Sequence, residues 1–142
     1  MKKLIISLCL ILSIFSLVAC NKEKISNDIK IDISKSSKFS KDEINKAIDC
    51  IKNNFSFPAS TLTKIWYDEE KSNSLVDVYL KNGQGSVNGV SSKNIIILLT
   101  NFDVDDSGDN PVLEPNSTYT DYQWVLKRDN ETSAWEIDDC GY

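Results

Sequence analysis

The fold is decided by one short apolar stretch, Asn94-Ile95-Ile96-Ile97-Leu98-Leu99. A continuous run of branched aliphatic residues of this length is typical of a strand buried inside a sheet. We therefore expect this segment to be the most buried strand of the domain.

Three further strands are predicted around this run. Residues 61–67 are rich in Thr, Ile and aromatic side chains, which favour a pleated, half-buried surface. Residues 122–128 and 134–137 flank a polar turn at Asp129-Asn130 and predict a hairpin. The chain between residues 72 and 80 has two alternatives: a short helix capped by Ser72 or Asn73, or a strand.

A helix is predicted to begin at Ser40. Ser40-Lys41-Asp42-Glu43 has the spacing of a capping box, and Phe39 and Ile44 occupy the positions of a hydrophobic staple. One apolar stripe then follows at helical spacing, formed by Ile44, Ala47, Ile48, Ile51 and Phe55. This stripe indicates an amphipathic helix whose apolar face belongs to the core.

The segment before the helix also leaves two alternatives. Residues 20–38 are polar enough to form a tether, which would average about 23 Å end to end and reach about 60 Å when stretched. The alternation Ile29-Lys30-Ile31-Asp32-Ile33 would instead suit a short edge strand. With the tether, the single domain covers residues 39–142.

The first twenty residues indicate export and anchoring. Lys2 and Lys3 precede an apolar run that ends in Leu17-Val18-Ala19-Cys20. Residues 1–19 therefore read as a signal peptide, because the run is too short for a membrane span. The cysteine after a small residue resembles the lipobox of bacterial lipoproteins, in which Cys20 receives a lipid anchor with palmitate-like acyl chains. The alternative is an ordinary signal peptide followed by a chance cysteine.

The charge balance bears on the partners. The chain carries 16 basic and 21 acidic residues, and loss of Lys2 and Lys3 leaves a net charge of −7. Nucleic acid is not expected as a partner, because its binding requires clustered Lys and Arg. The expected partners are the membrane, through the lipid anchor, and a protein or other ligand of the cell envelope.

Cysteine usage predicts a disulfide. Cys9 leaves with the signal peptide and Cys20 is consumed by lipid, so Cys50 and Cys140 remain. Two remaining cysteines in an exported protein are candidates for a bridge. The alternative is a pair of buried thiols that act as small apolar side chains.

The chain contains no histidine. This removes the commonest general base and the usual activator of a serine or cysteine nucleophile. Asp68, Glu69 and Glu70 remain as a carboxylate group that a hydrolase could use, although three carboxylates after a strand usually form a solvated turn. We therefore expect a protein that is not an enzyme.

One acidic loop has the start of a calcium-binding pattern. Oxygen ligands fall at loop positions 1, 3 and 5, glycine at position 6 and a glutamate at position 12; the candidate ligands are Asp103, Asp105, Ser107, Asp109 and Glu114. Pro111 at position 9 and the strand before the loop disagree with an EF-hand. The alternatives are an isolated calcium loop and a plain acidic connection without a cofactor.

Several motifs resemble a family of small, uncharacterised lipoproteins of Gram-positive bacteria. They are Trp66-Tyr67-Asp68-Glu69-Glu70, residues 94–102, Pro115-Asn116-Ser117-Thr118-Tyr119, Trp124-Val125-Leu126 and Gly141-Tyr142. The resemblance covers residues 38–142. It implies an α+β fold in which the N-terminal amphipathic helix packs on a curved antiparallel sheet of four to five strands, similar to cystatin-like or NTF2-like cones. It implies no functional residues.

These observations predict a lipid-anchored protein on the extracytoplasmic face of the cell membrane. Its expected role is that of a non-enzymatic binding module. One alternative is a calcium-dependent structural or adhesive protein, and the other is a carboxylate-based hydrolase.

Overall fold

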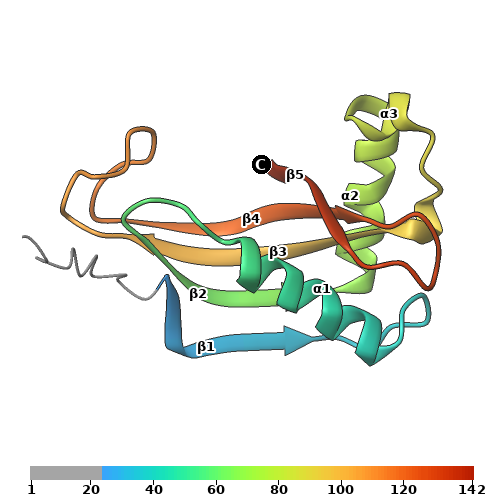
Figure 1. The fold of residues 1–142 in the computed structure, drawn as a ribbon, viewed down its shortest axis with the longest axis horizontal. Helices are drawn as coiled ribbons and strands as arrows, with labels where there is room; N and C mark the ends of the chain where they lie inside the picture. Colours follow the sequence, from blue (N-terminus) through green and yellow to red (C-terminus); the bar gives the residue numbers. More distant parts are fainter. Residues whose placement is uncertain (1–23) are drawn as a thin grey trace, which may run out of the picture.

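The computed structural model describes residues 24–142 (Figure 1). This part of the chain is an α+β domain with an open five-stranded sheet in the order β1-β2-β3-β4-β5. The strands are β1 (Ile25–Ile33), β2 (Ser60–Tyr67), β3 (Ile95–Val104), β4 (Ser117–Lys127) and β5 (Glu136–Gly141). The helices are α1 (Lys41–Asn54), α2 (Glu69–Asn82) and the single turn α3 (Gly85–Asn88), and a 3-10 turn, η1, covers Ser92–Asn94.

The sheet is mixed, so the prediction of an antiparallel sheet is wrong at one edge. β1 runs parallel to β2, with Ile31 opposite Ile65, whereas β2 to β5 pair antiparallel. The cause is the connection between these strands. Helix α1 carries the chain back to the end where β1 began, and a crossover of this kind joins parallel strands.

Residues 25–33 form a strand in place of the predicted tether. β1 contributes Ile29 and Ile33 to the edge of the core under α1, and its pairing with β2 continues to Tyr67. The edge-strand alternative therefore describes this segment. The folded part begins at least fourteen residues before the predicted boundary at residue 39.

β3 is buried on both faces, as its apolar run suggests. Ile96 and Leu98 belong to a large core under α1, and Ile95 and Ile97 belong to a smaller core under α2. Because successive strand residues point to opposite faces, the two helices must lie on opposite sides of the sheet. Each of these four side chains is at most 1% exposed.

The two long helices begin at different caps. At α1 the Ser40 hydroxyl accepts from the Glu43 amide and the Glu43 carboxylate accepts from the Ser40 amide, which completes the predicted capping box. At α2 the cap is Asp68, whose side chain accepts from the Lys71 amide at 2.8 Å. The predicted cap Ser72 lies inside this helix, where its hydroxyl accepts a hydrogen bond from the Ile97 amide.

Segment 72–80 is therefore helical, and the strand alternative is wrong.

Within residues 24–142, no helix is both long enough and apolar enough to cross a membrane.

Candidate binding groove at Arg128 and Trp135

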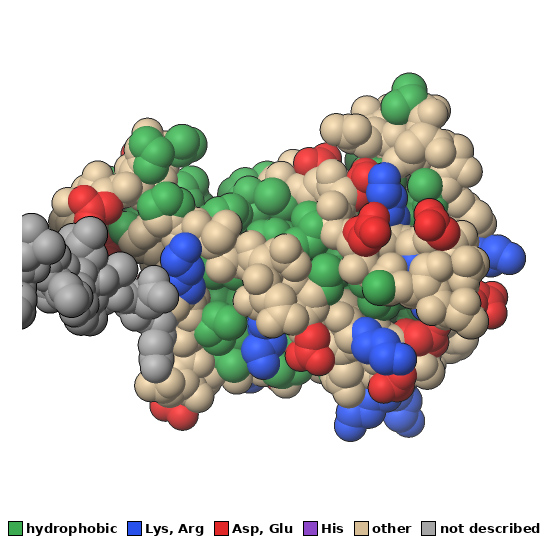
Figure 2. All heavy atoms as spheres, in the orientation of Figure 1, with side chains coloured by type: hydrophobic (Ala, Val, Ile, Leu, Met, Phe, Trp, Pro, Cys, Tyr) green, Lys and Arg blue, Asp and Glu red, His purple; other side chains and the backbone are tan. Residues whose placement is uncertain are grey.

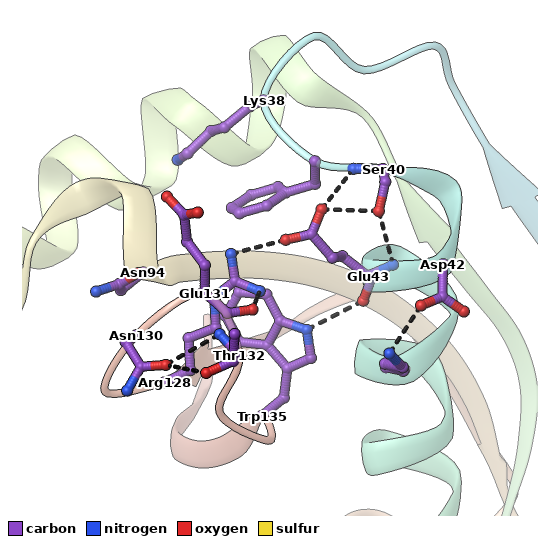
Figure 3. Close-up of polar contacts among 12 residues, drawn as sticks. Lys38, Ser40, Asp42, Glu43, Asn94, Arg128, Asn130, Glu131, Thr132 and Trp135 are labelled. Atoms are coloured by element: carbon purple, nitrogen blue, oxygen red, sulfur yellow. Dashed lines mark hydrogen bonds and ion pairs between the residues drawn. The ribbon is translucent and has the colours of Figure 1, made fainter.

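An open groove of about 810 Å³ lies between α1 and the connection from β4 to β5. We call it the Arg128 groove. From α1 it is lined by Glu43, Lys46, Asp49, Cys50, Asn53 and Asn54. Its other wall consists of Arg128 and residues 131–135. Figure 3 shows how the side chains of Arg128 and Trp135 point toward Glu43 in the first turn of α1.

Arg128 is the key residue of the wall, because it is a charged side chain that is only 6% exposed. Its Nη2 lies 2.8 Å from Oε1 of Glu43, and its Nη1 donates to the Glu131 carbonyl at 3.3 Å. The guanidinium carbon lies 4.4 Å from the ring centre of Trp135 and 5.7 Å from that of Phe39. A planar cation satisfies the carboxylate and both aromatic faces at once, which an ammonium group cannot do.

Trp135 ties the same wall to α1 through a second contact. Its indole N–H donates to the Glu43 carbonyl at 3.0 Å, and its ring meets that of Phe39 edge-on at 5.6 Å. Glu43 therefore binds the wall through both its backbone and its side chain. This double attachment fixes the distance between the two sides of the groove.

The turn between β4 and β5 is held by short-range hydrogen bonds. The Asn130 side chain accepts from the amide and the hydroxyl of Thr132, at 3.0 and 2.7 Å (Figure 3). The Asn94 carbonyl accepts a hydrogen bond from the Arg128 amide, and the Asn94 side-chain amide donates to the Asp129 carbonyl. These hydrogen bonds hold the turn in place beside Arg128.

The electrostatics favour the charged pair. Hydrogen bonds from the Ser40 amide, from the Ser40 hydroxyl and from Arg128 lower the pKa of Glu43, although partial burial acts in the opposite direction. Glu43 is therefore ionised at neutral pH, and the charge of Arg128 is neutralised inside the wall. Beyond this pair the lining combines amide and hydroxyl groups with three exposed charged side chains, those of Lys46, Asp49 and Glu131.

Cys50 lies in the groove and Cys140 on β5, and both thiols are free. The Cys50 thiol donates to the Trp135 carbonyl at 3.3 Å, whereas the Cys140 sulfur accepts from the Tyr122 hydroxyl at 3.7 Å. The structure thus contains no Cys50–Cys140 disulfide, because each sulfur points to a different partner. Burial, with a smaller effect of Glu136, raises the pKa of Cys50, so its thiol stays protonated and weakly nucleophilic.

The candidate calcium ligands do not form a cluster. Asp103 lies on β3 and accepts from the Thr118 hydroxyl of β4, and Asp105 accepts from the amide and hydroxyl of Ser107. The backbone of Glu114 donates to the Tyr119 hydroxyl. No set of three or more acidic, cysteine or histidine side chains within residues 24–142 is grouped as a metal site would require.

Two of the three carboxylates named for a hydrolase, those of Asp68 and Glu69, stabilise the fold. Asp68 caps α2, and Glu69 accepts from the hydroxyls of Ser36 and Ser37 and from the amides of Ser37 and Lys38. These contacts fasten the 34–38 loop to the start of α2.

The roles of Arg128 and Trp135 in the groove were not predicted from the sequence. One signal was available: Arg128 is the only arginine among 16 basic residues, so lysine is used at every other basic position. Cys20, the predicted lipidation site, lies outside the described residues.

The chain belongs to a family whose model matches residues 22–141 and which is described as a domain of unknown function (DUF4829). The match covers the whole five-stranded domain, including β1. No curated protein and no solved structure matches the chain at a significant level.

Proposed function

We propose that this chain is a lipid-anchored binding module on the extracytoplasmic face of a Gram-positive bacterial membrane. In this proposal it binds a polar ligand of the cell envelope in the Arg128 groove and catalyses no reaction. The observation that carries the proposal is the buried Arg128–Glu43–Trp135 contact, which fixes the groove wall without a ligand.

A fixed wall supports binding because a preformed site loses little conformational entropy when the ligand arrives. The chemistry of the lining favours one ligand class. Asn53, Asn54, Thr132 and Ser133 offer amide and hydroxyl groups that match sugars and peptide bonds. Cell-wall peptidoglycan presents both groups, so its fragments are the ligands we propose.

Three features support a role without catalysis. The sequence contains no histidine, and the carboxylates of Asp68 and Glu69 are engaged in capping α2 and holding the 34–38 loop. The thiol of Cys50 is kept protonated by burial. A search for release of sugars from purified cell walls provides the direct check, and turnover would contradict this part of the proposal.

The fold is proposed to be of the cystatin-like or NTF2-like type. Support comes from α1 on one face of the sheet and from the antiparallel order of β2 to β5. The parallel strand β1 and helix α2 on the opposite face are additions to that pattern.

The binding proposal is tested by titrating the soluble domain, residues 24–142, with peptidoglycan fragments and following backbone amides by NMR. Shifts should concentrate on residues 43–54 and 128–135. Asn53→Ala should weaken binding several-fold, whereas Asn27→Ala, an exposed asparagine on β1, should leave it unchanged. Shifts elsewhere on the domain, or none at saturating fragment, would contradict the groove as the binding site.

The anchoring proposal rests on the sequence Leu17-Val18-Ala19-Cys20 and is tested separately. Cells expressing the wild-type chain should incorporate labelled fatty acid into it, and Cys20→Ala should abolish this labelling. Labelling that persists in the variant would overturn the lipid anchor.

A further inference from the structure

The folded part of the chain starts very close to the proposed anchor. The Lys24 carbonyl accepts from the Leu62 amide at 2.9 Å, and the Lys24 ammonium donates to the Ser56 carbonyl at 3.3 Å. Only four peptide steps separate Cys20 from Lys24. A fully extended chain of this length spans about 14 Å, so the start of β1 must stay within that distance of the lipid.

We infer that this end of the domain rests on the bilayer surface, with Val112 at the contact. The inference rests on the proposed lipid anchor at Cys20. The tether expected from the sequence would let the domain move tens of ångströms from the membrane, whereas the structure leaves no such length. The occupant of this surface is therefore the membrane that holds the anchor.

Loop 105–116 shares this end of the molecule. Its first residue, Asp105, donates its amide to the Ala59 carbonyl at 2.8 Å, and Asn110 donates its side-chain amide to the Pro58 carbonyl at 2.9 Å. The 55–59 connection also supplies Ser56, which holds Lys24. Figure 1 shows the loop projecting at the end where β1 begins.

The loop holds an apolar side chain outward. Val112 is 85% exposed, although its backbone is fixed. The buried side chain of Asn110 accepts from the amides of Val112 and Leu113 at 3.0 and 2.8 Å. In Figure 2 hydrophobic side chains are visible on this projection, next to acidic ones. A rigidly presented valine loses little entropy on entering the headgroup region, and its burial is favourable.

The charges at this end predict which lipids matter. Lys24 and Lys52 line a hollow beside β1, but the loop carries Asp106, Asp109 and Glu114. With acidic groups on the projection itself, an anionic surface provides no net attraction. The contact should therefore form equally well on phosphatidylcholine vesicles and should not strengthen when phosphatidylglycerol is added.

A matched residue at the opposite end permits a sharp test. Val87 in α3 is 84% exposed, and the ten-residue strand β3, about 33 Å long, runs between the two ends. The lipidated full chain is prepared as Val112→Cys or Val87→Cys in a Cys50→Ser, Cys140→Ser background and labelled with one fluorophore. It is then placed in phosphatidylcholine vesicles that carry a nitroxide on the headgroup.

The inference predicts that the label at position 112 loses most of its fluorescence and the label at position 87 very little. Equal quenching at both positions, or stronger quenching at position 87, would overturn it while the anchor stands. Flotation of the vesicles is measured on the same samples. Protein that fails to float with them would instead overturn the lipid anchor of the proposed function.

A second measurement avoids the substitutions. Amide hydrogen exchange is compared between the native lipoprotein on vesicles and the domain without its lipid. Attachment to the vesicle should slow exchange in residues 110–114 and leave the exchange rates of residues 85–89 unchanged. Unchanged exchange at 110–114 in vesicle-bound protein would also overturn the inference. That result is the one expected if a protein partner, and not the membrane, covers Val112.

Discussion

The two faces of the sheet are closed in different ways. Under α1 the core is large and rich in aromatic rings, and it ends at a buried cation, Arg128, bound to Glu43. Under α2 the core is small and ends at a phenol, Tyr79, whose hydroxyl donates to Asp138 and accepts from Asn88. One face is thus closed by a fixed charge and the other by a neutral hydroxyl.

This difference corresponds to the surface above each face. The Arg128 groove measures about 810 Å³, whereas the hollow beside Tyr79 measures about 270 Å³. A buried cation can hold a carboxylate and two rings at once, which fixes the connection between β4 and β5 at a set distance from α1. The phenol lets α2 lie directly on the sheet. The ligand site that we propose therefore lies on the α1 face.

Replacing the buried cation should have the largest effect on stability. Arg128→Met leaves the Glu43 carboxylate facing a partly buried apolar wall, and breaking such a pair costs about 3 kcal/mol. Urea unfolding followed by tryptophan fluorescence measures the loss. The double variant Arg128→Met, Glu43→Gln should recover part of it. The loss of free energy of unfolding should exceed that of Tyr79→Phe on the α2 face. A smaller loss would show that the buried cation is not the stronger of the two closures.

The corresponding change on the α2 face should cost less. Tyr79→Phe removes a hydroxyl bonded to Asp138 and Asn88 and should lower the free energy of unfolding by about 1–2 kcal/mol. Asp138 retains Lys127 as a partner, which limits the effect. The same urea experiment provides the measurement, with Tyr142→Phe, an exposed tyrosine, as control.

Acid should loosen the segment that leads into α1. Hydrogen bonds from Ser36, Ser37 and the Lys38 amide lower the pKa of Glu69 to about 2, below its ordinary value of about 4.3. Because the folded-state pKa is the lower one, this stabilisation is complete above about pH 4.3 and is lost as the pH falls toward 2. The melting temperature should fall less steeply between pH 6 and pH 2 in Glu69→Gln than in the wild type. Parallel profiles would contradict this role of Glu69.

The two thiols should not be linked, and Cys50 should react slowly in the folded domain. Mass spectrometry after alkylation of the unfolded domain, without reductant, should find two modified cysteines. In the folded domain, Cys50 should react far more slowly than a free thiol, since burial raises its pKa. No alkylation before reduction would show that the disulfide predicted from the sequence forms after all.

The sequence predicted those parts of the fold that depend on neighbouring residues. The capping box at Ser40 lies within four residues, and the apolar run from Ile95 to Leu99 marks the central strand by itself. The cap of α2 was misplaced because Ser72 and Asp68 are both good capping residues. The hydrogen bond from the Ile97 amide of β3 to the Ser72 hydroxyl decides between them, and a contact between distant segments cannot be seen in the local sequence.

Contacts between distant residues could not be predicted. Trp135 donates to Glu43 across 92 residues, and no local pattern indicates that pairing. The parallel strand β1 likewise depends on where α1 returns the chain. The polar composition of residues 20–38 had favoured a tether, although the alternation in residues 29–33 also suited an edge strand. The candidate site depends on contacts between residues that are distant in the sequence. The single arginine was its one feature visible in the sequence.

Arg128 holds the groove wall against α1 through its planar guanidinium. Amide hydrogen exchange of Arg128→Lys, which keeps the charge but loses the fork and the ring contacts, tests it most directly. We predict faster exchange in residues 129–135 and in the first turn of α1, with unchanged exchange in α2. Unchanged exchange in the wall, or a uniform increase across both faces of the sheet, would show that the Arg128 guanidinium does not hold the wall.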